Sequence, residues 1–217
     1  MPRAALVTPL TVSISISFLR IARTDISLAF LTHIGEAYVP LAFQYAREAA
    51  VAANLDVKLF YNDYGIESTG TKNTNAIALV KNVLAYGKNI DGVGFESHFS
   101  TSYYPTTASV MGAMKGFTNL GLDIHVTELD VACPSSSPTA AQLATQAEAY
   151  YSTISACMQT TLCTGMTLWD FDSQYSWIQP ASNSGEGAAD IYSASLTAYP
   201  AVTAVMQAIQ GQACTVC

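Results

Sequence analysis

The sequence has few charged residues, and basic residues are the scarcest of them. Charged residues make up 12% of the 217 positions, about half the usual share of roughly 25%. Only 9 Lys and Arg stand against 16 Asp and Glu, for a formal net charge of -7. Because nucleic acids and anionic membrane surfaces are bound through Lys and Arg, we expect neither as a partner. A neutral partner such as a polysaccharide fits this composition.

A long apolar run is also lacking. No stretch of 18 apolar residues occurs, so the sequence predicts no transmembrane helix. Residues 4–19 are mostly apolar or small and follow Arg3, which faintly resembles a signal peptide, but Pro9 and several hydroxyl residues interrupt them. The stretch from Val12 to Phe18 alternates with the period of a strand. We nevertheless expect residues 1–22 to be an irregular or spurious leader, and not a convincing signal peptide.

The three His do not lie near the Cys pairs, and zinc sites of the usual kind need these residues at ligand spacing. We therefore predict no metal and no cofactor. Cys157 and Cys163 bracket the junction between a predicted helix and the next apolar run, where a short disulfide would suit an exported protein. Cys214 and Cys217 have C-x-x-C spacing without the strand-to-helix context of a redox site. The sequence leaves open the roles of this pair and of Cys133.

What the sequence has in quantity is hydrophobic residues, at 50%, which is ample for a buried core. From about residue 34, helical and strand periodicities alternate. Helices are predicted at 34–53, 73–86, 105–120, 138–158 and 196–210. Strands are predicted at 57–61, 92–95, 123–127 and 164–168. This order predicts one α/β domain with a parallel sheet and right-handed crossovers.

Polar or aromatic side chains follow the carboxyl end of each predicted strand. They are Asn62, Asp63 and Tyr64, then Glu96 and His98, then Glu128 and Asp130, then Trp169 and Asp170. In a (β/α)8 barrel the active site is built at this end of the strands. Glu96 and His98 are two residues apart and should share a face. The pattern therefore predicts a histidine beside two carboxylates from the next strand.

Side-chain alternation makes a further prediction for the segment from Asp123 to Asp130. Glu128 and Asp130 should share a face, with Ile124 and Val126 below them on the same face. His125 should then point toward the helices and be structural. Carboxylates are rarely buried without a partner, so two of them on one face at a strand end favour a site.

Four motifs closely resemble those of the glycoside hydrolase family 10 endo-1,4-β-xylanases. They are residues 58–64 (KLFYNDY), 91–99 (DGVGFESHF), 127–130 (TELD) and 169–177, which begins with Trp-Asp and ends in Trp. The resemblance runs from about residue 23 to about residue 210. It implies the C-terminal half of a (β/α)8 barrel, truncated at the N-terminus, with residues 23–217 as a partial catalytic domain. It also implies secretion, and xylan or xylo-oligosaccharides as the substrate.

The resemblance assigns roles to three residues at the centre of the expected site. Glu128 matches the nucleophile that attacks the anomeric carbon in a retaining mechanism. His98 matches the histidine that hydrogen-bonds this nucleophile, and Asp130 matches the residue that orients the histidine. Taken alone, Glu128 would often be a surface carboxylate and His98 a structural histidine, but the four motifs together favour the site.

Five further positions belong to the expected substrate cleft by the same resemblance. Asn62 and Tyr64 match its polar rim on the leaving-group side. Trp169 and Trp177 match aromatic residues that wall the sugar subsites, although aromatic residues are more often simply core. Glu96 stands where the family usually has Gln. We do not expect Glu96 to replace a general acid, because it should lie on the opposite face from the leaving group.

The resemblance also implies that one part of the site is missing. In this family the acid/base Glu follows an Asn at the end of the fourth strand, before the helix near Ile34. Residues 1–29 contain no Asn-Glu pair, so we expect the activity of this chain to be impaired or absent. The alternative is a non-catalytic carbohydrate-binding or unstable half-barrel remnant from a truncated gene model. Open sheet edges would favour self-association.

Overall fold

The computed structural model describes residues 10–15, 30, 32–87, 89–178 and 185–217. The strands are β1 (Leu10–Ser15), β2 (Val57–Asp63), β3 (Gly92–Phe95), β4 (His98–Ser100), β5 (Asp123–Ala132) and β6 (Cys163–Leu168). The helices are the 3-10 turn η1 (Gly35–Ala37), then α2 (Tyr38–Ala52), α3 (Thr71–Ala85), α4 (Thr107–Thr118), α5 (Ala140–Gln159) and α6 (Pro200–Ile209). Every predicted strand and helix is present, with ends displaced by a few residues.

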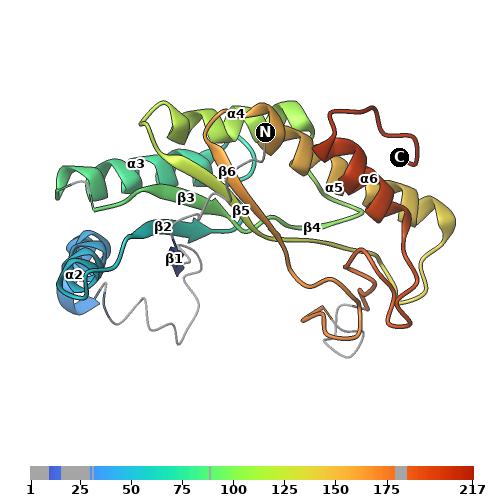
Figure 1. Cartoon of the computed structure of the whole chain (residues 1–217), viewed down its shortest axis with the longest axis horizontal. Coiled ribbons are helices and arrows are strands. Elements are labelled where there is room, and N and C mark those ends of the chain that lie inside the picture. Colours follow the sequence, from blue (N-terminus) through green and yellow to red (C-terminus); the bar gives the residue numbers. More distant parts are fainter. Residues whose placement is uncertain (1–9, 16–29, 31, 88, 179–184) are drawn as a thin grey trace, which may run out of the picture.

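All named strands pair in parallel in one sheet. The order β1-β2-β3-β5 is continuous, and both β4 and β6 pair with β5. Because β5 is long, β6 lies along its first part and β4 along its last, where His98 is opposite Asp130. Helices α3, α4, α5 and α6 lie along one side of this sheet (Figure 1). The predicted parallel α/β arrangement is therefore confirmed.

Local sequence explains where the helices begin. Thr139 accepts a hydrogen bond from the backbone N–H of Gln142, while the Gln142 side chain accepts one from the backbone N–H of Thr139. This capping box satisfies two backbone donors that a helix start otherwise leaves unpaired. Thr106 caps α4 in a similar way, and Pro200 occupies the first turn of α6, where its missing N–H costs nothing.

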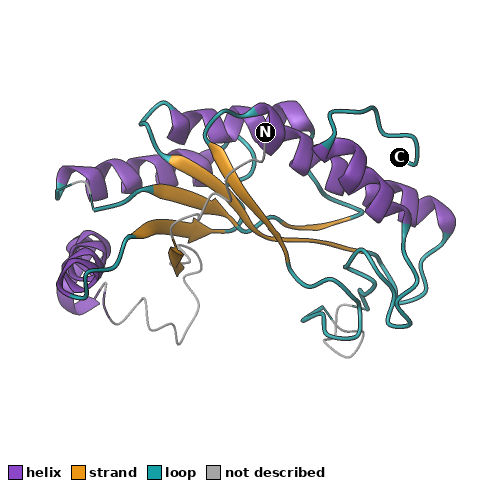
Figure 2. Cartoon of the chain, viewed as in Figure 1, coloured by secondary structure: helices purple, strands orange, loops and turns teal. Residues whose placement is uncertain are grey.

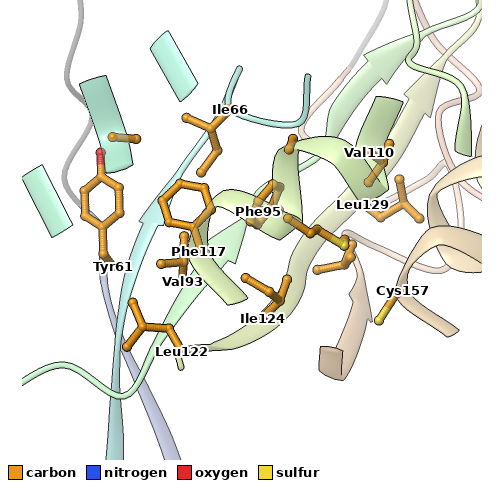
Figure 3. Packing of buried hydrophobic residues seen from close by; sticks show 14 of the residues in the cluster. Tyr61, Ile66, Val93, Phe95, Val110, Phe117, Leu122, Ile124, Leu129 and Cys157 are labelled. Atoms are coloured by element: carbon orange, nitrogen blue, oxygen red, sulfur yellow. The ribbon is translucent and has the colours of Figure 1, made fainter. Parts of the chain in front are cut away.

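The core lies between the sheet and the helices on that side (Figure 3). Phe95 of β3 packs edge to face against Phe117 of α4, with ring centroids 5.7 Å apart. Ile124 and Leu129 of β5 belong to the same buried cluster, and neither side chain is exposed. Burial of this apolar surface attaches the helices to the strands and fixes the strand ends that carry polar side chains.

One prediction about β5 is wrong. Ile124 and Val126 pack in the helix-facing core, so they do not lie below Glu128 and Asp130. The pairing of β5 with β6 shifts register between Val126 and Leu129, as at a β-bulge. A bulge inserts an extra residue and reverses which side chains face the core. Leu129 therefore joins the core, and Glu128 and Asp130 turn to the other side.

The prediction for His125 is wrong for the same reason. His125 alternates with core residues and lies on the face away from the helices, where its ring contacts that of Phe60 at 4.4 Å between centroids. Its Nε2 is 3.0 Å from Thr164 Oγ1. A Cβ on Gly165 would lie 2.8 Å from the His125 ring, so a glycine is required beside it. Burial lowers the pKa of His125.

Residues 10–15 fall within the expected irregular leader, but they form β1, which pairs with β2 along six positions from Leu10 with Val57 to Ser15 with Asn62. The rest of that leader, residues 1–9 and 16–22, lies outside the described residues. The strand-like alternation from Val12 therefore predicted the structure of this segment better than the expectation of an irregular leader did. In the described part of the chain, no helix is both long and apolar enough to cross a membrane.

Two disulfides are present. Cys157 and Cys163 are bonded, as predicted, and join the end of α5 to the start of β6. Cys214 and Cys217 are also bonded. Cys133 is a buried free thiol, and burial raises its pKa to about 11. A thiol with a raised pKa holds little thiolate and is unreactive, which favours a packing role for Cys133.

Candidate active site

The predicted histidine and carboxylates come together where His98, the first residue of β4, lies beside the second half of β5, which carries Glu128 and Asp130. His98 Nε2 lies 3.3 Å from Glu128 Oε2. His98 Nδ1 lies 3.0 Å from Asp130 Oδ2. The imidazole therefore bridges two carboxylates from one strand, and each ring nitrogen has its own acidic neighbour.

Asp130 is fixed from a second direction. Its side chain is fully buried, and Trp177 donates a hydrogen bond from Nε1 to Oδ2 at 2.7 Å. The Trp177 ring also meets the His98 ring edge to face, with centroids 5.1 Å apart. A buried carboxylate needs donors, and Trp177 supplies one to Oδ2, while His98 Nδ1 lies 3.0 Å from the same oxygen.

Asn62 holds the other oxygen of Glu128. Asn62 Nδ2 donates to Glu128 Oε1 at 2.9 Å and to Glu96 Oε1 at 3.3 Å. Thr127 Oγ1 in turn donates to Asn62 Oδ1 at 2.6 Å, which fixes the orientation of the amide. A Cβ on Gly94 would lie 2.1 Å from Asn62 Oδ1. Gly94 is therefore needed for the Asn62 side chain to cross β3 and reach Glu128.

A turn, and not strand alternation, places Glu96 beside His98. Ser97 has a left-handed backbone with φ of 65°, and its N–H donates to the buried Glu67 Oε1 at 2.9 Å. A non-glycine residue in this region is strained and needs such a support. The expected proximity is present, because His98 Nε2 lies 3.7 Å from Glu96 Oε2.

The site is electrostatically crowded. Burial raises the pKa of Glu96 to about 7, and the nearby charge of Glu128 adds to this effect. Burial lowers the pKa of His98, but its bond and attraction to Asp130, with the charges of Glu96 and Glu128, outweigh burial and raise the pKa overall. A protonated imidazole has an N–H on each nitrogen and can donate to both Glu128 and Asp130.

Two open pockets meet at Trp177. One has a volume of about 430 Å³ and is lined by His98, Tyr103 and Glu186, among others. The other, of about 440 Å³, is lined by Trp169, Asp170 and Tyr175. Trp177 lines both pockets, and Trp169 and Trp177 are 45% and 59% exposed, so their rings offer flat apolar surface to solvent. The segments between β6 and α6 that supply these aromatic side chains gather at one end of the sheet (Figure 2).

Tyr64 contacts a lysine side chain, unlike the other residues expected in the site. Lys72 Nζ lies 3.6 Å from the centroid of the Tyr64 ring and forms an ion pair with Asp63 at 2.9 Å.

Sequence reasoning missed Thr127, Gly94 and Glu67, which support the site through Asn62 and Ser97. The glycine spacing in the segment 91–99 was the one available signal, since a strand glycine often marks a close approach of another group.

The geometry also offers a group of metal-binding atoms. One donor atom each from Glu96, His98 and Glu128 lie within 4.8 Å of one another. Carboxylate oxygen and imidazole nitrogen are both zinc ligands. The spacing of His and Cys along the sequence, on which the expectation of no metal rests, does not reveal carboxylates that meet only in the fold.

Parallel strands joined by helices, with polar side chains at their carboxyl ends, place the protein in the class of β/α-barrel proteins. A sequence model of glycosyl hydrolase family 10 matches residues 21–208. The chain belongs to glycosyl hydrolase family 10, and the predicted family resemblance and the predicted partial (β/α)8 barrel are confirmed.

Several relatives and solved structures are similar to the chain. Endo-1,4-beta-xylanase D of Talaromyces funiculosus is 42% identical over 183 residues, which are 83% of this chain and 43% of that protein. Endo-1,4-beta-xylanase 1 of Humicola insolens is 38% identical over 176 residues, 81% of this chain and 40% of that protein. The chain thus spans less than half the length of these relatives.

The solved structures agree with this partial match. Penicillium canescens endo-1,4-beta-xylanase XylE has a TM-score of 0.82 and 44% identity, over 87% of this chain and 57% of that one. A GH10 xylanase from Bispora sp. MEY-1, solved with xylobiose, has a TM-score of 0.79 and 41% identity, over 86% of this chain and 56% of that one.

Proposed function

We propose that the chain carries the nucleophile side of a retaining endo-1,4-β-xylanase site, with Glu128 as the nucleophile. The observation that carries the proposal is the arrangement of Glu128 and Asp130 of β5 around His98 of the parallel strand β4. His98 and Asn62 each donate toward one Glu128 oxygen, which orients the carboxylate. Xylan and xylo-oligosaccharides are the proposed substrates, since the related proteins are named xylanases.

The chemistry follows from this geometry. A Glu128 carboxylate oxygen attacks the anomeric carbon, and the glycosidic C–O bond breaks as a glycosyl ester forms. His98, held by Asp130, keeps Glu128 in place and balances its charge before the attack. Trp169 and Trp177 provide flat apolar faces on which pyranose rings can stack. Asn62 and Tyr64 are proposed to line the leaving-group side of the cleft.

The leaving-group oxygen needs a proton, and we propose that no residue in the described part of the chain is placed to donate it. Residues 1–29 contain no glutamate at all, although β1 lies beside β2 where the family's fourth strand is expected. Glu96 holds a proton readily, but it lies against His98 and Glu128 on the nucleophile side. General acid–base catalysis contributes roughly 10²–10⁴-fold, so we propose that xylan hydrolysis by this chain is slower by at least that factor.

An activated substrate tests the nucleophile independently of the general acid. A dinitrophenyl β-xylobioside has a leaving group that departs without a proton, so Glu128 alone should release one phenolate per chain in a burst. The following hydrolysis should be slow for want of a general base. Added azide, which needs no base, should accelerate turnover and yield the β-xylobiosyl azide.

Two variants control this experiment. Glu128→Gln should abolish the burst, whereas Glu48→Gln makes the same chemical change on the exposed side of α2 and should leave it intact. Equal bursts from the native chain and Glu128→Gln would disprove the nucleophile. Retained xylan binding without any burst would favour a non-catalytic carbohydrate-binding remnant.

We further propose secretion, which the two disulfides support.

A further inference from the structure

The donor atoms of Glu96, His98 and Glu128 are spaced like the ligands of a small metal ion. His98 Nε2 lies 3.3 Å from Glu128 Oε2 and 3.7 Å from Glu96 Oε2. In tetrahedral coordination with bonds of about 2.0–2.1 Å, neighbouring ligand atoms are about 3.3 Å apart. We propose that Glu96, His98 and Glu128 bind Zn²⁺, with a water molecule as the fourth ligand.

The histidine already has the orientation that such a site requires. Nδ1 of His98 faces Asp130 Oδ2 at 3.0 Å, which leaves Nε2 directed at the two glutamates. A carboxylate behind a histidine ligand fixes the ring and raises its basicity in many zinc sites. Asp130 is fully buried, and its Oδ1 accepts no hydrogen bond from any described residue. The Asp130 carboxylate behind His98 thus adds to the acidic surroundings of the three ligands.

The negative charge of Glu96 and Glu128 also favours a bound cation. Within the described ranges, no Lys or Arg forms an ion pair with either glutamate, and Lys72 pairs with Asp63 instead. Two carboxylates held this close repel each other unless a cation or a proton lies between them. Glu96 supplies the second negatively charged ligand of the proposed site. The Gln expected at this position from the family resemblance would supply only a neutral amide.

The donor set selects among the divalent ions. Imidazole nitrogen with carboxylate oxygen suits Zn²⁺, whereas Ca²⁺ and Mg²⁺ prefer six or more oxygen ligands. The side chains of Glu96, His98 and Glu128 are 12%, 20% and 20% exposed, so water can reach the remaining coordination position. Zn²⁺ at this site would occupy Glu128, so metal and sugar would exclude each other. The inference goes beyond the proposed function and holds whether or not the chain cleaves xylan.

Calorimetric titration of the chelator-treated, disulfide-intact chain with ZnCl₂ tests this site. We expect saturable binding of one Zn²⁺ per chain, weakened at least tenfold by Glu96→Gln. Glu48→Gln removes the same charge from an exposed helix position and should bind Zn²⁺ like the native chain. MgCl₂ should give no comparable binding. Circular dichroism would verify that each variant is folded.

A second measurement covers the case in which Glu96→Gln fails to fold. Co²⁺ in place of Zn²⁺ should give the visible absorption of a four-coordinate site, and Glu128→Gln should remove it. Absence of saturable Zn²⁺ binding by the native chain would overturn the proposal. So would equal binding by the native chain, Glu96→Gln and Glu128→Gln, because the metal would then lie elsewhere. Mg²⁺ affinity equal to that for Zn²⁺ would overturn the assignment of the metal.

Discussion

The Gly94→Ala substitution tests how the fold positions Glu128. The new Cβ would lie 2.1 Å from Asn62 Oδ1 and 2.9 Å from Thr127 Cγ2, so Asn62 must move. Its hydrogen bond with Thr127 is worth about 0.5–1.5 kcal/mol and its bond to charged Glu128 about 1.5–3 kcal/mol. Overpacking adds about 1–3 kcal/mol. The low ends of these ranges together give a loss of about 3 kcal/mol.

Urea unfolding of four proteins measures this effect: the native chain, Gly94→Ala, Asn62→Ala and the double variant. In the Asn62→Ala background the clash with Oδ1 is gone, so Gly94→Ala should cost only about 1 kcal/mol. The coupling between the two positions should therefore be about 2 kcal/mol. Gly112→Ala is the matched control, because its Cβ would meet only Thr69 Cγ2 at 3.6 Å and should stabilise α4 by about 0.5–1 kcal/mol. Additive costs for Gly94 and Asn62 would refute the argument.

Three further substitutions probe separate parts of the structure. Cys163→Ser removes the disulfide with Cys157, which closes a short loop, and should lower the free energy of unfolding by about 2 kcal/mol in denaturant titrations; an unchanged midpoint would contradict this. Trp177→Phe removes the bond to Asp130 Oδ2 and should cost about 1.5–3 kcal/mol in the same assay, whereas a neutral result would mean that water replaces the indole. Burial raises the pKa of Asp190 from 3.8 to about 6, so the folded state retains a proton there that the unfolded state releases. Stability should therefore fall as the pH rises from about 4 to about 6, and Asp190→Asn should flatten this part of the pH profile; an identical slope in the variant would count against it.

Much of the fold follows from patterns that are visible in the sequence. The strand at 57–61 and the helix at 138–158 each carry a strong periodicity, so their predicted ranges differ from β2 and α5 only at the ends. The polar residues that follow the predicted strands were expected to come together, and Asn62 and His98 do each lie within contact distance of Glu96 and Glu128. The Cys157 and Cys163 pair could be predicted because the two residues are close in sequence.

The details that failed are those that depend on neighbouring strands. Alternation along β5 predicted that Ile124 and Glu128 share a face, but the register shift after Val126 separates them. That shift depends on pairing with β6, which lies about 40 residues further on and has no local sequence signal. Likewise, Gly94 reveals its role only when Asn62 of the adjacent strand is in place.

The proposed metal site shows a similar limit. Glu96 was interpreted through strand alternation, but its position depends on the left-handed turn at Ser97 and the buried carboxylate of Glu67. A sequence search for His and Cys spacing cannot find a site whose carboxylate ligands come from the connection between β3 and β4 and from β5. Only the assembled sheet places Glu96 within reach of Glu128.

The nucleophile can be identified directly by trapping it. A 2-fluoro xylobioside with a dinitrophenyl leaving group forms a glycosyl ester that hydrolyses slowly, and mass spectrometry of the digested chain then locates the sugar. We predict one fluoroxylobiosyl group per chain, attached to Glu128 in the peptide that contains Thr127 and Asp130, and no label in Glu128→Gln. Attachment to Glu96 or any other residue, or equal labelling of Glu128→Gln, would contradict the assignment of Glu128 as the nucleophile.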